Sequence, residues 1–169
     1  MLRVDLAHLE RERSLQVEGI LEPDQHSFEG CAFVLEKPLH VVLTATWAIS
    51  GEVVLRGRLT GSVAQACRRC LEPVERTVDA GITMIFAPSK LLEDNDEEKR
   101  RIEPSQRKID LGPYLRDELI MSVPMYVECR ADCRGLCTGC GMNLNEADCQ
   151  CSTEDMDPRW DALRALKSE

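Results

Sequence analysis

The sequence predicts an α+β protein, with a curled antiparallel β-meander or partial barrel followed by a C-terminal helix and a cysteine-rich segment. Three observations support this prediction. Residues 41–86 contain three runs with apolar side chains at alternate positions, the period of half-buried strands. Residues 110–122 have leucines spaced as on one face of a helix. Six of the nine cysteines lie between residues 129 and 151.

The three strand-like runs each have one apolar face and one polar face, which is typical of an antiparallel sheet with one side in water. The apolar positions are Val41, Leu43, Ala45, Trp47 and Ile49, then Val53, Leu55, Leu59 and Val63, then Val74, Val78, Ala80, Ile82, Met84 and Phe86. Gly57 and Gly61 in the second run predict a bulge or sharp bend. Earlier strands are expected at 14–20 and 31–36, after a short charged lead-in at 1–13.

The rest of the chain divides by composition. Residues 1–88 are expected to form a β-rich domain, and residues 89–108, charged and without an apolar period, a loop or linker. Residues 109–169 should contain a helix and the cysteine-rich segment, packed on the sheet. The helix begins at Asp110, buries Leu111, Leu115 and Leu119, and ends at Pro124. A short final helix should follow Asp157-Pro158.

The net charge of −9 shows that the chain is not a general phosphate binder. A basic protein partner is electrostatically easier. The N-terminus lacks the apolar run of a signal peptide, and no stretch is long and apolar enough to span a membrane. We therefore expect a cytoplasmic protein. In a reducing compartment, clustered cysteines favour metal over disulfides.

Cysteine spacing predicts a zinc knuckle. In Cys137-x-x-Cys140, two thiols converge on one point, and Gly141 permits the backbone turn that follows. The expected partners are Cys149 and Cys151, which would complete a four-thiolate Zn²⁺ site.

A second four-thiolate site is predicted from the remaining clustered thiols, Cys67, Cys70, Cys129 and Cys133. Two alternatives remain open. Cys129 or Cys133 could replace a ligand of the first site, and Cys67 with Cys70 could be a thiol pair without metal. Cys31 is left over as a core thiol.

No enzymatic activity is expected. Four thiolates close the coordination sphere of zinc and leave no position for water, which favours structural metal. The sequence contains neither a glycine-rich phosphate loop nor the His-x-Glu of a zinc deaminase, and no small-molecule substrate is expected. A thioredoxin-like role for Cys67 and Cys70 is disfavoured because a β-run, not a helix, follows them.

Four arginines flank the cysteines, and two interpretations remain open for them. They could compensate thiolate charge locally, or they could form a small basic patch against RNA phosphate or an acidic partner surface. These residues are Arg68, Arg69, Arg130 and Arg134.

The order of motifs resembles the YceD-type family of bacterial and plastid proteins, named for large ribosomal RNA subunit accumulation. The resemblance rests on the following motifs: Cys67-Arg68-Arg69-Cys70-Leu71-Glu72-Pro73, then Ile109-Asp110-Leu111 with Glu118-Leu119-Ile120 and Pro124, then the cysteine-rich segment with Asn143-Leu144-Asn145, and Asp157-Pro158-Arg159-Trp160. It implies a role in large-subunit biogenesis, supporting accumulation or maturation of large-subunit rRNA. A non-enzymatic factor would then hold a basic ribosomal protein, a processing enzyme or rRNA on the large-subunit precursor. The alternatives are a thiol-redox or metal-handling protein, and an adaptor unrelated to ribosomes.

Overall fold

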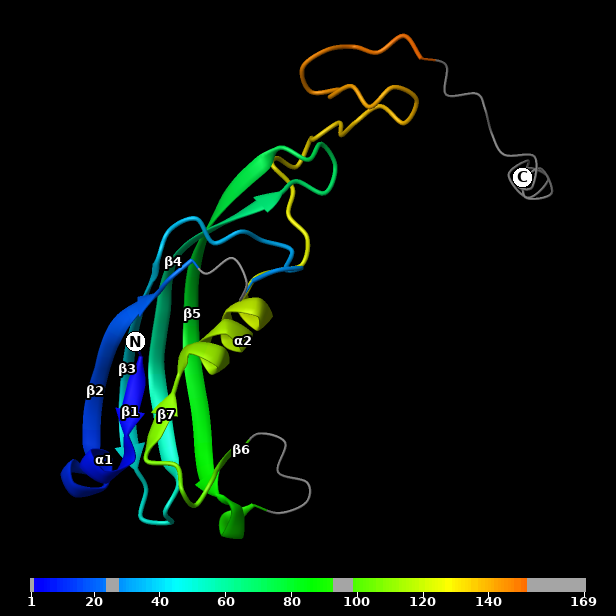
Figure 1. The fold of residues 1–169 in the computed structure, drawn as a ribbon. Helices are drawn as coiled ribbons and strands as arrows, with labels where there is room; N and C mark the ends of the chain where they lie inside the picture. Colours follow the sequence, from blue (N-terminus) through cyan, green and yellow to red (C-terminus); the bar gives the residue numbers. More distant parts are fainter. Residues whose placement is uncertain (1, 24–27, 93–98, 152–169) are drawn as a thin grey trace, which may run out of the picture. The chain divides into compact units, whose positions relative to one another are not determined.

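A computed structural model describes residues 2–23, 28–92 and 99–151 of the chain. The chain forms two compact units (Figure 1). The first, here called the sheet unit, comprises Met1–Gln65 and Glu75–Met125. The second, the cysteine unit, comprises Ala66–Val74 and Tyr126–Glu169. The final helix predicted after Asp157 lies outside the described residues.

The main sheet has five strands in the order β2-β3-β4-β5-β6. Their bounds are β2 Ser14–Leu21, β3 Leu39–Trp47, β4 Val53–Ala66, β5 Pro73–Pro88 and β6 Lys99–Ile102. β3 pairs antiparallel with both β2 and β4, as the meander prediction requires. β6 departs from it, because it pairs parallel with β5. The sheet is mixed and stays open, with β2 and β6 at its edges, so it does not close into a barrel.

Strand burial follows the predicted alternation. In β3, residues from Leu39 to Ala45 are buried at every second position, and the intervening residues are exposed. The same holds for the predicted apolar face of β4, and most of that of β5 is buried as well. Ile49 is the exception: β3 ends at Trp47, so Ile49 lies in the following turn and is fully exposed. The strand expected at 31–36 is reduced to a single bridge between Val34 and Ala64.

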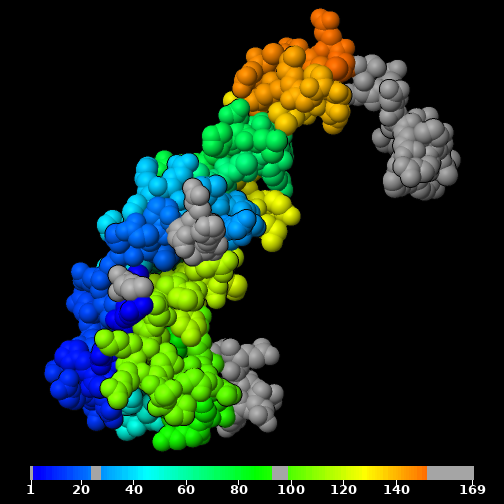
Figure 2. Space-filling model, viewed as in Figure 1, coloured from blue at the N-terminus to red at the C-terminus, as the bar shows by residue number. Residues whose placement is uncertain are grey.

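The charged lead-in expected at 1–13 is instead ordered structure. β1 (Arg3–Asp5) leads into α1 (Leu6–Glu12), which is capped by the Asp5 side chain accepting from the His8 amide at 3.1 Å. β1 pairs antiparallel with β7 (Lys108–Asp110), and Val4 and Ile109 are buried at the centre of this two-stranded sheet. In Figure 2 the blue N-terminal residues accordingly lie beside yellow-green ones.

The prediction of a loop throughout 89–108 is corrected by three elements within its range: the 3-10 turn η1 (Ser89–Leu91), β6 and the start of β7. Arg100 on β6 explains how so charged a segment is fixed. Its guanidinium donates to Glu118 at 2.9 Å and lies 5.1 Å from the centre of the Tyr114 ring. These partners lie more than ten residues downstream, so no local pattern announces them.

The helix α2 (Gly112–Ser122) matches its prediction closely. Leu111, Leu115 and Leu119 are completely buried, and Pro113 occupies the first turn, where no backbone donor is needed. The helix belongs to the sheet unit, whereas the sequence had grouped it with the cysteine-rich segment. Neither α1 nor α2, the α-helices of the described residues, is long and apolar enough to cross a membrane.

Gly57 marks a close approach of two strands. The register between β3 and β4 runs without interruption from His40–Thr60 to Trp47–Val53, so there is no bulge at Gly57. A Cβ atom on Gly57 would lie 2.0 Å from the Val42 carbonyl oxygen and 2.7 Å from the Leu43 Cα. Backbone atoms cannot rotate away, so only glycine fits here.

We expect Gly57→Ala to lower the free energy of unfolding of the sheet unit by about 1–3 kcal/mol, because the methyl group overpacks two backbones. Urea denaturation would measure the change. Gly81→Ala in β5 is the matched control, since nothing lies within 4 Å of the added methyl group; it should be neutral or stabilising by up to about 1 kcal/mol. Equal effects of the two substitutions would contradict the close approach.

Candidate metal centre

The two Cys-x-x-Cys segments fold into the same local structure. In each, the first cysteine accepts two hydrogen bonds from backbone amides. Its Sγ accepts from the residue two positions later, and its carbonyl oxygen accepts from the residue four positions later. The first cysteine's own amide donates to the carbonyl five residues on. In the knuckle starting at Cys67, these three hydrogen bonds are 3.5, 2.9 and 2.8 Å long. In the knuckle starting at Cys137, they are 3.3, 2.8 and 2.8 Å long. Both segments are therefore knuckles of one type, closed by their own backbone.

The fifth position of each knuckle adopts a left-handed backbone. Gly141 has φ 74° there, which glycine adopts without strain. Leu71 occupies the equivalent position with φ 63° and keeps its side chain 63% exposed. A side chain in this conformation costs about 1–2 kcal/mol, so the first knuckle carries strain that the second does not.

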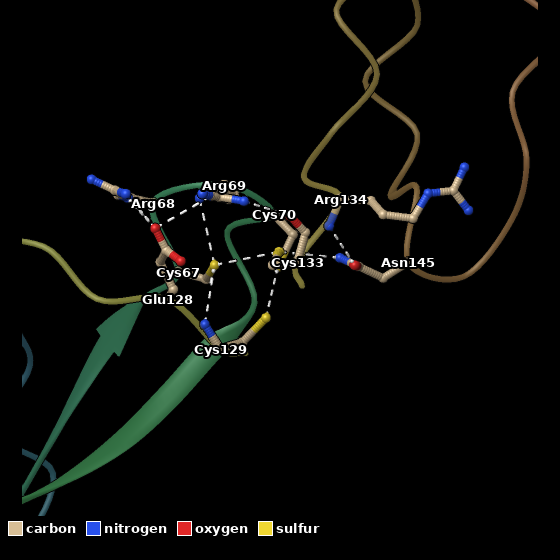
Figure 3. A network of polar contacts seen from close by, with 9 residues as sticks. All are labelled: Cys67, Arg68, Arg69, Cys70, Glu128, Cys129, Cys133, Arg134 and Asn145. Carbon is tan, nitrogen blue, oxygen red and sulfur yellow. Dashed lines mark hydrogen bonds and ion pairs between the residues drawn. The ribbon is translucent and has the colours of Figure 1, made fainter. Parts of the chain in front are cut away.

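The first group of thiols, here called the buried centre, consists of Cys67, Cys70, Cys129 and Cys133 (Figure 3). All four sulfurs lie within 4.8 Å of one another. Cys67 and Cys133 are 3.9 Å apart, and Cys70 and Cys129 are 3.6 Å apart. Three of the four residues are buried, and Val74 and Leu136 pack against them.

The second group, here called the exposed centre, consists of Cys137, Cys140, Cys149 and Cys151, again with all sulfurs within 4.8 Å. The Cys149 sulfur lies 3.3 Å from that of Cys137 and 3.4 Å from that of Cys140. Only Cys137 is buried, and Cys140 and Cys151 are exposed. The loop from Cys140 to Cys149 folds back so that both pairs face one point.

Both groups fit a tetrahedral metal ion. With metal–sulfur bonds of about 2.3 Å, the ligand sulfurs of such an ion are about 3.8 Å apart. The observed separations are close to this value and well beyond the roughly 2.05 Å of a disulfide; all nine cysteines are free. The structure brings the eight predicted ligands together in the two predicted sets of four, and Cys31 packs against the core of the sheet unit.

The electrostatics of the thiols are uneven. The backbone amide of Cys70 lowers the pKa of the Cys67 thiol to about 6, and that of Cys140 does the same for Cys137. Burial, and then the neighbouring thiols, raise the pKa of Cys129 to about 12. The thiol of Cys149 is the main cause that raises the pKa of Cys151 to about 12. The first cysteine of each knuckle therefore ionises more readily than an ordinary thiol, and a divalent cation would favour deprotonation of the other thiols.

The four predicted arginines each pair with an acidic side chain. Arg68 and Arg69 both contact Glu128, at 2.7 Å and 3.3 Å, and Arg69 also donates to the Cys133 carbonyl oxygen at 2.9 Å. The remaining pairs are Arg130 with Asp132 at 3.6 Å and Arg134 with Asp148 at 2.8 Å. These ion pairs are with carboxylates and not with the thiols whose charge the arginines were expected to compensate. All four side chains remain about half exposed.

Two residues of the site were not predicted from the sequence. Glu128 holds the arginine pair of the first knuckle, and its position directly before Cys129 was the available signal. Asn145 is predicted only as part of the Asn143-Leu144-Asn145 motif, yet its side chain contacts the Cys133 sulfur at 3.4 Å. The sequence gives little indication of this contact, because it joins a loop of the exposed centre to a ligand of the buried centre.

The family model described as "Large ribosomal RNA subunit accumulation protein YceD" matches residues 55–167, which include all eight clustered cysteines. The chain belongs to the YceD family. An uncharacterized protein of Mycobacterium tuberculosis is 32% identical over 117 residues, which are 69% of this chain and 56% of the relative.

Two plant relatives carry a descriptive name, large ribosomal RNA subunit accumulation protein YCED homolog 1, chloroplastic. The Arabidopsis thaliana protein is 30% identical over 73 residues, 43% of this chain and 23% of the relative. The Zea mays protein is 20% identical over 135 residues, 63% of this chain and 46% of the relative. The chain spans about half the length, or less, of these relatives. No solved structure matches it significantly.

The fifth position is leucine in one knuckle and glycine in the other, so exchanging the two residue types should have opposite effects on stability. Leu71→Gly should raise the free energy of unfolding of the cysteine unit by up to about 1 kcal/mol, because it removes the left-handed strain at an exposed side chain. Gly141→Leu should lower it by about 1–2 kcal/mol, although nothing lies within 4 Å of the added Cβ. Denaturant unfolding would measure both. A Leu71→Gly protein that is clearly destabilised would show that the side chain makes a stabilising contact.

Proposed function

We propose that this chain is a non-enzymatic factor in large ribosomal subunit biogenesis that contains two structural zinc ions. It supports the accumulation or maturation of large-subunit rRNA. The observation that carries the proposal is the family match across residues 55–167, which spans both centres. The names of the plant relatives give the same direction.

The zinc assignment is supported by the donor set. Four thiolates at tetrahedral spacing are typical of structural Zn²⁺ and close its coordination sphere. Between residues 126 and 151 the described chain has turns and one isolated bridge, Leu136–Asn143, in place of helices or strands. A segment with so little regular structure needs another source of folding energy, and metal binding supplies it.

The mode of action is proposed to be binding. An acidic chain favours a basic ribosomal protein as its direct partner, and the half-exposed arginines of the cysteine unit are the candidates for an rRNA contact. Because each arginine already has an acidic partner, RNA would have to compete with that partner. We therefore expect this contact to be weak and to fall steeply with salt.

Metal content tests the first half of the proposal. The protein purified without chelator should carry two zinc ions per chain, as measured by native mass spectrometry and elemental analysis. Cys70→Ser and Cys137→Ser should each lose one ion and make the cysteine unit sensitive to protease, since metal binding energy is folding energy. Cys31→Ser, outside both centres, is the control and should keep two. A single zinc in the unmodified protein would overturn the two-centre proposal.

Ribosome association tests the second half. The tagged protein should sediment with large-subunit precursors in its own cells, and its deletion should lower large-subunit rRNA. Replacing Arg68, Arg69, Arg130 and Arg134 by Ala should reduce the association several-fold while leaving both zinc ions in place. Replacing Arg3, Arg56, Arg58 and Arg116 by Ala, which changes the net charge equally within the sheet unit, should leave it intact. Equal losses would show that only net charge matters.

Metal handling is the second candidate, and the exposure of Cys140 and Cys151 is the observation that favours it. A metal-handling protein would pass zinc from the exposed centre to an apo-acceptor. It would also remain absent from large-subunit precursors, so the same sedimentation experiment separates the two candidates.

A further inference from the structure

The loop between Cys140 and Cys149, which belongs to the exposed centre, reaches the buried centre through one side chain. The Asn145 amide nitrogen Nδ2 lies 3.4 Å from the Cys133 sulfur (Figure 3). Cys133 is only 3% exposed, so water has little access to this sulfur. A hydrogen bond from an amide to a buried thiolate is stronger than the same bond in water.

The orientation of the Asn145 side chain is fixed by its other contacts. The backbone amide of Arg134 donates to Oδ1 of Asn145 at 2.8 Å, which identifies that atom as the acceptor. Nδ2 therefore faces the sulfur with one hydrogen and donates its other hydrogen to Asn143 Oδ1 at 2.8 Å. Both polar groups of Asn145 are thus satisfied by the segment that carries Cys133 and by its own loop.

The loop is itself fastened near the buried centre. The Leu144 amide donates to the Gly135 carbonyl oxygen at 2.9 Å, and Leu136 forms a bridge with Asn143. The two ends of the loop are Cys140 and Cys149, both ligands of the exposed centre. A metal ion there would tie these ends together and hold Asn145 in place.

We propose that Asn145 couples the two metal centres, so that filling the exposed centre delivers a hydrogen bond to Cys133 and strengthens metal retention at the buried centre. The inference rests on the proposed two-zinc function. Asn145 acts as a positioning residue, because it contacts a ligand and not the metal. Thermodynamic linkage makes the coupling reciprocal, so metal at the buried centre also tightens the exposed one.

The test compares Asn145→Asp with Asp148→Ala in the metal-loaded full chain. Asp keeps the oxygen that accepts from Arg134 but cannot donate to sulfur, and it adds a negative charge beside the thiolate. Asp148→Ala removes the other contact between this loop and Arg134, at 2.8 Å, without touching sulfur. It therefore controls for a general loosening of the loop.

Two readouts are needed. Zinc loss to a chelator should be biphasic, and Asn145→Asp should accelerate the slower phase, assigned to the buried centre, about 10–100-fold, the usual effect of losing a partner of a metal ligand. Asp148→Ala should leave that phase within a factor of two or three. In the ¹¹³Cd-substituted protein, whose NMR spectrum should show one resonance per centre, Asn145→Asp should shift the buried-centre resonance. A purely structural role for Asn145 would leave that resonance in place.

A double-mutant cycle keeps the inference testable if Asn145→Asp alone folds poorly. Cys151→Ser removes one ligand of the exposed centre, so metal should leave the buried centre faster. Adding Asn145→Asp to Cys151→Ser should then have little further effect on the rate of metal loss. Retention by the buried centre that is unchanged in Cys151→Ser would overturn the coupling. That result would leave the proposed function standing, whereas a protein that binds no metal at either centre would overturn the zinc assignment itself.

Discussion

The cysteine unit depends on the convergence of thiol groups. In its described residues, 66–74 and 126–151, the buried apolar cluster is itself built of Cys67, Cys70 and Cys133, supported by Val74 and Leu136. Such a cluster buries too little surface to order a chain of this length by the hydrophobic effect alone. The two knuckles present four of the sulfurs, and the loop that carries Asn145 contacts the Cys133 sulfur. In this unit, a metal ion would do what a hydrophobic core does elsewhere.

The sheet unit uses the opposite strategy. Its core is a continuous set of aliphatic side chains from the main sheet, the small β1–β7 sheet and both α-helices, with few aromatic residues. Charged segments join it through specific pairs, as Arg100 does with Glu118 and Tyr114. The two units are therefore expected to lose stability for different reasons. Loss of a metal ion from the proposed centres would act on the cysteine unit, and loss of packing would act on the sheet unit.

The features predicted well from sequence are those with a local signal. The alternation in β3 and β4, the stripe of Leu111, Leu115 and Leu119, and the grouping of Cys137 and Cys140 with Cys149 and Cys151 each depend on residues close together in the chain. β1 and α1 were missed because three and seven residues are too few to show a period. β6 was missed because its order comes from partners far along the chain, and Asn145 because its contact crosses between two centres.

The sequence separation of the ligands differs sharply between the two centres. Cys70 and Cys129 are 59 residues apart, whereas Cys140 and Cys149 are separated by 9. Closing the longer loop costs about 1.7 kcal/mol more in chain entropy. During synthesis, Cys67 and Cys70 therefore emerge from the ribosome before Cys129, which is made nearly sixty residues later. The nascent chain would be exposed to oxidants and to competing metals over that interval, so filling the proposed buried centre with zinc would depend on the reducing power and zinc supply of the compartment where translation takes place.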